Sequence, residues 1–274
     1  VLQLDSTNAE QNATTFSVGS LGTLSTNTFG FTAGVNGNAD SVNKLGNDIV
    51  AYCFADTDNR VKAGSYIGNG SAPGAYVQTG FRPAMVLIKN IADGGTNWML
   101  FDDARGPFSP LFPNTAAAEE TPGPTTSKVE LLSDGFRPLS SDNSVNASGQ
   151  TLVYIAFAAN FSASSTAEEL NTENLSDVEI TDPSTSFQTI VEPGAGILSA
   201  AQGAFPNGLW WVKDMANANQ HQFVDSVRGG NLALTCPTLG SDQAYSAPSG
   251  NSVVWAWSAG SQAPATNDDG TTQT

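Results

Sequence analysis

Short apolar runs separated by polar turns dominate the chain. Four of them are rich in β-branched, aromatic or other apolar residues and are bounded by Gly, Asn, Asp, Ser or Pro, as β-strands usually are. They cover residues 84–88, 98–101, 129–132 and 152–158. The pattern predicts an all-β fold with little helix, made of tandem antiparallel β-sandwich units of the jelly-roll or lectin-like type.

One stretch departs from this pattern. Residues 161–200 lack a strong hydrophobic period and are rich in Ser, Thr, Glu and Asp, which predicts a connection between units with one strand near 178–180. The only helix candidate lies in it at 165–170, where Ser165 and Glu168 have capping-box spacing.

Similar segments recur along the chain and predict a repeat. Three strands follow a Gly and two polar residues, and their aromatic residues Phe54, Phe157 and Trp257 are 103 and then 100 residues apart. Between the last two units, Lys89 and Lys213 differ by 124 residues. The predicted units are residues 1–55, which match only the second half of a unit, then 56–160 and a diverged 161–260, with a flexible tail at 261–274. A half sandwich leaves an apolar face open, so we expect residues 1–55 to complete their core against the next unit, another chain or an upstream segment.

Both later units contain the motif Asp-x-x-Arg-Gly. Its members are Asp102 with Arg105 and Asp225 with Arg228, and the two arginines are 123 residues apart. Because the planar guanidinium binds a carboxylate with two donors, the motif predicts an ion pair that fixes a strand end to a turn, with capture of a ligand carboxylate as the alternative. The acidic pairs 102–103 and 119–120 meet the carboxylate requirement of a glycosidase without fixing its geometry.

Composition limits the classes of partner that the chain can bind. Ten Lys and Arg against 26 Asp and Glu give a formal charge of -16, which disfavours a nucleic-acid partner. No apolar run reaches the roughly 18 residues that a membrane helix needs, so no membrane partner is expected. Cys53 and Cys236 form no CxxC motif, and we interpret both as free, buried residues, with a disulfide between them or a reactive thiol as the alternatives.

Candidate chemistry is sparse. His221 is the only histidine, and the repeat aligns it with Trp98, so it is interpreted as a packing position rather than a general base. The acidic turns at 56–59 and 267–270 are interpreted as solvated, because the first lacks the Gly and Glu of a calcium loop. No dinucleotide, P-loop or HExxH motif occurs. We therefore predict no enzyme, catalytic residue, cofactor or metal site.

The tryptophans are the remaining candidates for a ligand. Strand alternation puts Trp255 and Trp257 on one face, most simply that of the core. The adjacent Trp210 and Trp211 must point to opposite faces of a strand, so one of them is the better candidate for exposure and for stacking on a sugar ring.

Several of these motifs together resemble one family. They are AGSYIGNGS at 63–71, TGFRPAMVLIK at 79–89, DARGP at 103–107, VNASG at 145–149, YIAFA at 154–158, GLWWVKD at 208–214 and DSVRGG at 225–230. The chain from about residue 20 onward resembles a repeated domain of uncharacterised function found in tail-fibre and other virion proteins of marine bacteriophages, although the shortened last unit departs from the pattern.

The resemblance implies a function without implying any catalytic residue. It implies a non-enzymatic virion structural protein, a fibre or capsid-decoration component on the particle surface and hence outside the cell. The expected partners are other virion proteins and further copies of the chain, with a trimer favoured. The alternative is a phage adhesin that binds or cleaves host surface glycans.

Overall fold

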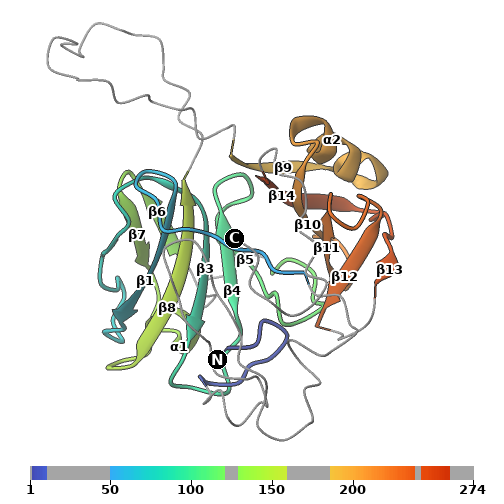
Figure 1. Cartoon of the computed structure of the whole chain (residues 1–274). Helices are drawn as coiled ribbons and strands as arrows, with labels where there is room; N and C mark the ends of the chain where they lie inside the picture. The colour runs from blue at the N-terminus through green and yellow to red at the C-terminus, as the bar shows by residue number, and fades with distance from the viewer. Residues whose placement is uncertain (1, 11–49, 121–128, 159–185, 238–241, 260–274) are drawn as a thin grey trace, which may run out of the picture.

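The computed structural model describes residues 2–10, 50–120, 129–158, 186–237 and 242–259 (Figure 1). Its strands form three sheets in which every neighbouring pair is antiparallel. The five-stranded sheet contains β1 (Val61–Ile67), β8 (Thr151–Ala158), β3 (Pro83–Asn90), β4 (Met99–Asp102) and β5 (Gly106–Leu111), in that order. The predicted strands at 84–88, 98–101 and 152–158 lie in β3, β4 and β8, and the all-β sandwich fold with little helix is confirmed.

The six-stranded sheet has the same order of elements. From one edge it contains β9 (Phe187–Pro193), β14 (Asn251–Ser258), β10 (Gly208–Asp214), β11 (His221–Asp225), β12 (Leu232–Cys236) and β13 (Gln243–Ala244). The registers also correspond. Leu87 of β3 lies opposite Leu100 and Ile155, and Trp211 of β10 lies opposite Phe223 and Trp255.

The described residues also form a small sheet and two α-helices. The three-stranded sheet contains β2 (Val77–Gln78), β7 (Gly135–Pro138) and β6 (Val129–Leu132), of which β6 is the predicted strand at 129–132. The helices are α1 (Asn143–Asn146) and α2 (Ile197–Ala204), the latter preceded by the short 3-10 turn η3 (Gly194–Gly196). None of the helices in the described part of the chain has the length and apolar character needed to cross a membrane.

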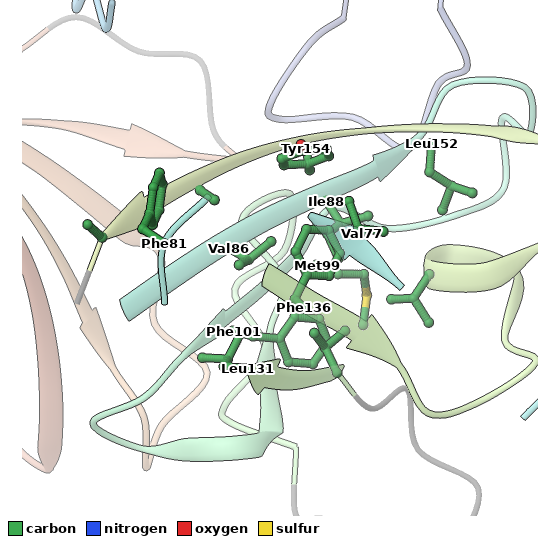
Figure 2. Packing of buried hydrophobic residues seen from close by; sticks show 14 residues of the cluster. Val77, Phe81, Val86, Ile88, Met99, Phe101, Leu131, Phe136, Leu152 and Tyr154 are labelled. Atoms are coloured by element: carbon green, nitrogen blue, oxygen red, sulfur yellow. The ribbon is translucent and has the colours of Figure 1, made fainter. Parts of the chain in front are cut away.

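Three cores hold the layers together. The small-sheet core lies between the three-stranded and five-stranded sheets and includes Val86, Phe101 and Phe136 (Figure 2). The central core lies between the two large sheets and includes Leu87, Phe157, Leu209, Trp211 and Trp255. The helix core lies between the six-stranded sheet and α2 and includes Leu198, Trp210, Val212, Val254 and Ala256.

The two large sheets are therefore covered on both faces along their inner strands β3 and β10. Every residue of β3 and of β10 is buried. A strand buried on both faces has an apolar side chain at nearly every position, which is why these runs show no alternation of apolar and polar residues. The two large sheets pack against each other through the central core rather than each closing its own sandwich.

Two sequence predictions fail at the connecting segments. Residues 50–55, predicted to lie in the first of the three aromatic strands, contain no strand. They form an extended strap between the six-stranded sheet and β1 (Figure 1). Their apolar pattern signals burial but specifies no pairing partner. The expected connection at 161–200 contains β9 and the start of α2. The helix candidate at 165–170, the strand near 178–180 and the tail 261–274 fall outside the described residues.

The described ends of the first 55 residues contact the rest of the chain. Leu4 and Tyr52 pack against the central core, and the Trp98 indole donates a hydrogen bond to the Gln3 carbonyl at 2.8 Å. We expect deletion of residues 1–55 to lower the free energy of unfolding by at least about 2 kcal/mol, because burying one apolar side chain is worth about 1.5 to 3 kcal/mol. Urea denaturation and a solubility assay measure this. Unchanged stability and solubility would contradict it.

Candidate functional site

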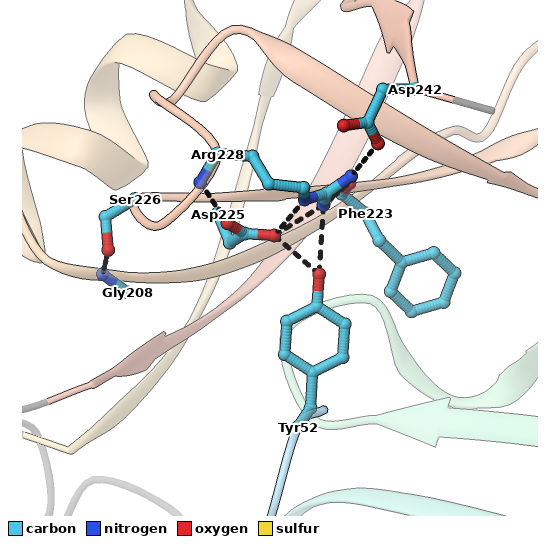
Figure 3. A network of polar contacts seen from close by, with 7 residues as sticks. All are labelled: Tyr52, Gly208, Phe223, Asp225, Ser226, Arg228 and Asp242. Carbon is cyan, nitrogen blue, oxygen red and sulfur yellow. Dashed lines mark hydrogen bonds and ion pairs between the residues drawn. The ribbon is translucent and has the colours of Figure 1, made fainter. Parts of the chain in front are cut away.

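A polar cluster at the end of β11 joins three distant parts of the chain (Figure 3). Asp225 is the last residue of this strand, and the turn that follows brings Arg228 back over it. The backbone N–H of Arg228 donates to Asp225 Oδ1 at 2.8 Å, and its Nε donates to Oδ2 at 2.6 Å. The Tyr52 hydroxyl donates to the same Oδ2 at 2.6 Å and accepts from Arg228 Nη2 at 3.0 Å. Asp242 accepts from Arg228 Nη1 at 2.7 Å.

The end of β4 carries the same arrangement. The backbone N–H of Arg105 donates to Asp102 Oδ1 at 2.9 Å and its Nε donates to Oδ2 at 2.7 Å. Nη1 donates to Glu119 at 2.6 Å. The Trp255 indole N–H donates to Asp102 Oδ2 at 3.0 Å, in the role that Tyr52 has at the other cluster. Each motif thus forms an aspartate–arginine tie with a donor from another part of the chain.

Sequence reasoning paired the aspartates with the arginines but missed the other members of both ties. Glu119 and Asp242 each lie 14 residues after their arginine, a spacing visible in the sequence. The two outside donors, Tyr52 and Trp255, each stand two residues before an aromatic residue of the recurring pattern, Phe54 and Trp257. The third equivalent position is Ile155, which has no donor group. The sequence therefore contained the signal for all four residues.

Hydrogen bonds keep the carboxylate of the Asp225–Arg228 tie ionised. Burial alone would raise the pKa of Asp225, but the hydrogen bonds from Arg228 and Tyr52 outweigh burial and hold this pKa below its usual value. Burial and the bond to Asp225 raise the pKa of Tyr52, so its hydroxyl stays protonated and donates. Such a cluster is suited to holding a strand end in place, because its charges already face each other.

Removing the Tyr52 hydroxyl tests its share in this tie. We expect Tyr52→Phe to lower the free energy of unfolding by about 1 to 3 kcal/mol, because a hydrogen bond to a charged group is worth about 1.5 to 3 kcal/mol. Denaturation by urea measures the change. The matched control is Tyr76→Phe, which removes an exposed hydroxyl bonded to Asp134 and should change stability by less than about 0.5 kcal/mol. Equal effects of the two variants would refute the role of Tyr52.

The same tie predicts a dependence on pH. Since the pKa of Asp225 is lower in the folded chain, the unfolded chain takes up the proton first as the pH falls. The stabilisation is complete above the unfolded pKa of about 3.9 and is lost as the pH falls through the folded pKa. We expect Asp225→Asn to cost about 1.5 to 3 kcal/mol at pH 7. Denaturation curves between pH 7 and pH 2.5 should show this difference shrinking below about pH 4; a constant difference would contradict it.

Two buried lysines form a second repeated structure. Lys89 Nζ donates to the Asn90 carbonyl at 2.7 Å, and Lys213 Nζ donates to the Asp214 carbonyl at 2.6 Å. The side chains of Asn90 and Asp214 in turn accept from the backbone N–H groups two and three residues later. Burial lowers the pKa of Lys213 to about 8, although the nearby negative charge of Asp214 acts to raise it. Both ammonium groups are held by carbonyls at the end of β3 or β10 and in the loop that follows, and so they fix the course of that loop.

His221 lies in the interior, in agreement with the predicted packing position. It is fully buried, its Nδ1 accepts a hydrogen bond from the Trp211 indole at 2.9 Å, and its ring stacks near Trp255. Burial holds the pKa of this imidazole well below its usual value, so the ring is neutral. Its ring is out of reach of a substrate at the surface.

The prediction of an exposed tryptophan in β10 is wrong. Trp210 and Trp211 are only 1% and 4% exposed. They do point to opposite faces, but Trp210 enters the helix core and Trp211 the central core, because β10 is an interior strand of a sheet covered on both sides. Neither can stack on a sugar ring. Trp255 and Trp257 share the central core, as predicted.

The cysteines and acidic turns have simple environments. Both cysteines are free, Cys236 buried as predicted and Cys53 exposed, contrary to prediction, because it lies in the strap and not in a strand. Asp56, in the first acidic turn, pairs with Lys62 at 2.9 Å. The described residues hold no group of three His, Cys, Asp or Glu side chains that could bind a metal ion. The second acidic turn, at 267–270, lies outside them.

Comparisons with known proteins give one match. The model of a domain of unknown function, DUF7483, matches residues 1–160. No curated protein and no solved structure matches the chain. The matched range contains the whole five-stranded sheet and the Asp102–Arg105 tie.

Proposed function

We propose that this chain, which belongs to the DUF7483 family of domains of unknown function, is a non-enzymatic structural protein of a bacteriophage particle. In this proposal it is a fibre or capsid-decoration component on the outer surface of the virion. The observation that carries the proposal is that the charged groups most able to do chemistry are used to hold strands and loops. Asp102, Arg105, Asp225 and Arg228 form the two ties, and His221 is buried and neutral.

We further propose that the chain is an internal duplication with a preceding half unit, bounded as the sequence predicts at 1–55, 56–160 and 161–260. The shared strand order of the two large sheets supports it. So do the equivalent ties at Arg105 and Arg228 and the equivalent buried lysines. In both units the ion pairs and buried lysines hold the fold together. Such a stable repeated unit suits a protein that faces solvent and neighbouring subunits.

The proposed partners are other virion proteins and further copies of the chain, with a trimer favoured. An acidic chain with a formal charge of -16 resists nonspecific association, which suits a particle surface outside the cell. Size-exclusion chromatography with light scattering measures the assembly state. A strictly monomeric chain at high concentration would count against the trimer while leaving the particle location to a separate test.

Locating the chain on intact particles tests the proposal directly. Antibodies raised against the purified chain should label particles from the source culture in negative-stain electron micrographs, at a regular position on fibre or capsid. Mass spectrometry of gradient-purified particles should detect the chain in constant stoichiometry. If the chain fractionates only with soluble protein and leaves purified particles unlabelled, the proposed function is wrong.

A further inference from the structure

The outer face of the six-stranded sheet is covered only in part. The helix α2 packs on the half formed by β9, β14 and β10. Beside it a pocket of about 320 Å³ opens over β11, β12 and β13, within the range of small-ligand sites. Its lining includes Asp214, Asn219, Gln222, Gln243 and Ser246.

The corresponding face of the five-stranded sheet is closed and apolar. Met99 of β4 lies opposite Ile88 of β3, as Gln222 of β11 lies opposite Val212 of β10. Met99 is buried in the small-sheet core, whereas Gln222 is half-buried and lines the pocket. The strands β6 and β7, which cover Met99, lie between β5 and β8 in the sequence. At the corresponding place, between β12 and β14, the described residues contain only the two-residue β13. The six-stranded sheet thus has no covering strands like β6 and β7 among the described residues, and Gln222, which faces the pocket, stands where the five-stranded sheet has the buried Met99.

The polar walls of the pocket are held in place. Gln222 and the backbone of Ser246 exchange two hydrogen bonds, at 2.7 and 2.9 Å. The Asp214 carboxylate accepts from two backbone N–H groups and from the amides of Asn217 and Asn219. A wall fixed in this way loses little conformational entropy when a ligand binds.

The chemistry of the lining selects the class of ligand. Its amides can donate and accept, as sugar hydroxyls also can, and the exposed amide of Gln243 makes no hydrogen bond within the described part of the chain. Among the described residues that line the pocket there is no lysine or arginine, which disfavours phosphate, sulfate and sialic acid. Its one carboxylate, Asp214, already accepts four hydrogen bonds, which disfavours a metal cation. We infer that this pocket binds a neutral saccharide, an activity that goes beyond the proposed structural role.

The purified full chain tests this inference on an array of neutral hexose and N-acetylhexosamine oligosaccharides, with sialylated and sulfated glycans on the same slide. We expect binding to at least one neutral glycan. The double variant Asn219→Ala with Gln243→Ala should weaken it by about fourfold to a hundredfold, since each lost hydrogen bond contributes about a factor of two to ten. Ala218→Trp, in an exposed loop, should abolish it by filling the pocket. Gln78→Ala, an exposed amide on the small sheet, is the matched control and should bind as the unaltered chain does.

Three outcomes would overturn the inference. They are no binding to any neutral glycan, binding only to charged glycans, and neutral-glycan binding that the pocket variants leave unchanged. Circular dichroism of each variant separates loss of the site from loss of the fold. Because the array uses the isolated chain, its result is independent of whether the chain is found on particles.

Discussion

Replacing Arg105 by alanine is expected to lower the free energy of unfolding by about 3 to 5 kcal/mol, the usual cost of removing one partner of a buried ion pair. The side chains of Arg105 and Asp102 are 2% and 0% exposed, so water cannot replace the lost partner. The guanidinium also donates to Glu119 and lies over the Trp255 ring, 5.7 Å from its centroid. Urea denaturation at pH 7 measures the loss.

Two further arginines provide a graded comparison. Arg228→Ala removes the equivalent tie, but this side chain is 12% exposed and water can partly solvate Asp225, so we expect about 1.5 to 3 kcal/mol. Arg137→Ala breaks an exposed pair with Glu130 and should cost less than about 1 kcal/mol. If Arg105→Ala costs no more than Arg137→Ala, the tie at β4 does not stabilise the fold.

Trp255→Ala is expected to have a comparable effect, about 3 to 5 kcal/mol, because it leaves a large cavity between the two large sheets. This residue is fully buried in the central core, packs against Trp211 and donates its indole N–H to Asp102 across the sheets. Trp255→Phe separates the two contributions. Phenylalanine keeps an aromatic ring, so only part of the packing is lost, together with the whole hydrogen bond. We therefore expect the free energy of unfolding to fall by less, about 1 to 3 kcal/mol.

The shared core also predicts how the chain unfolds. Since both large sheets depend on the same buried side chains, far-ultraviolet circular dichroism and tryptophan fluorescence should report one coincident transition in the unaltered chain. Trp255→Ala should shift both probes together, because both sheets lose the same buried side chain. Two resolved transitions before any substitution, or a loss below about 1 kcal/mol in Trp255→Ala, would contradict a common core.

Much of this fold can be predicted from local sequence. The runs that became β3, β4, β6 and β8 combine strand-forming residues with turn residues at their ends. The alternation that put Trp255 and Trp257 on one face also held, because a strand has a strict period of two. The Asp-x-x-Arg spacing placed both partners of each tie within one turn after a strand.

The predictions that failed, or that were missed, depend on contacts between elements far apart in the sequence. The burial of Trp210 requires α2, whose residues, 197–204, lie in a stretch with the composition of a linker although Leu, Ala and Gln favour helix. The burial of Trp211 requires the other large sheet. The role of Tyr52 depends on a contact with a residue 176 positions away. Alternation along one strand specifies opposite faces but not what covers each face.

That long separation has a consequence for how the protein is made. At about 5 to 20 residues per second, Arg228 is synthesised roughly 10 to 35 s after Tyr52. Trp255, which completes the tie at Asp102, follows its partner by 153 residues. Each tie can therefore form only after a residue far downstream of its first partner has been synthesised. A chain that ends before Asp225 contains the strap but lacks the carboxylate that accepts from the Tyr52 hydroxyl.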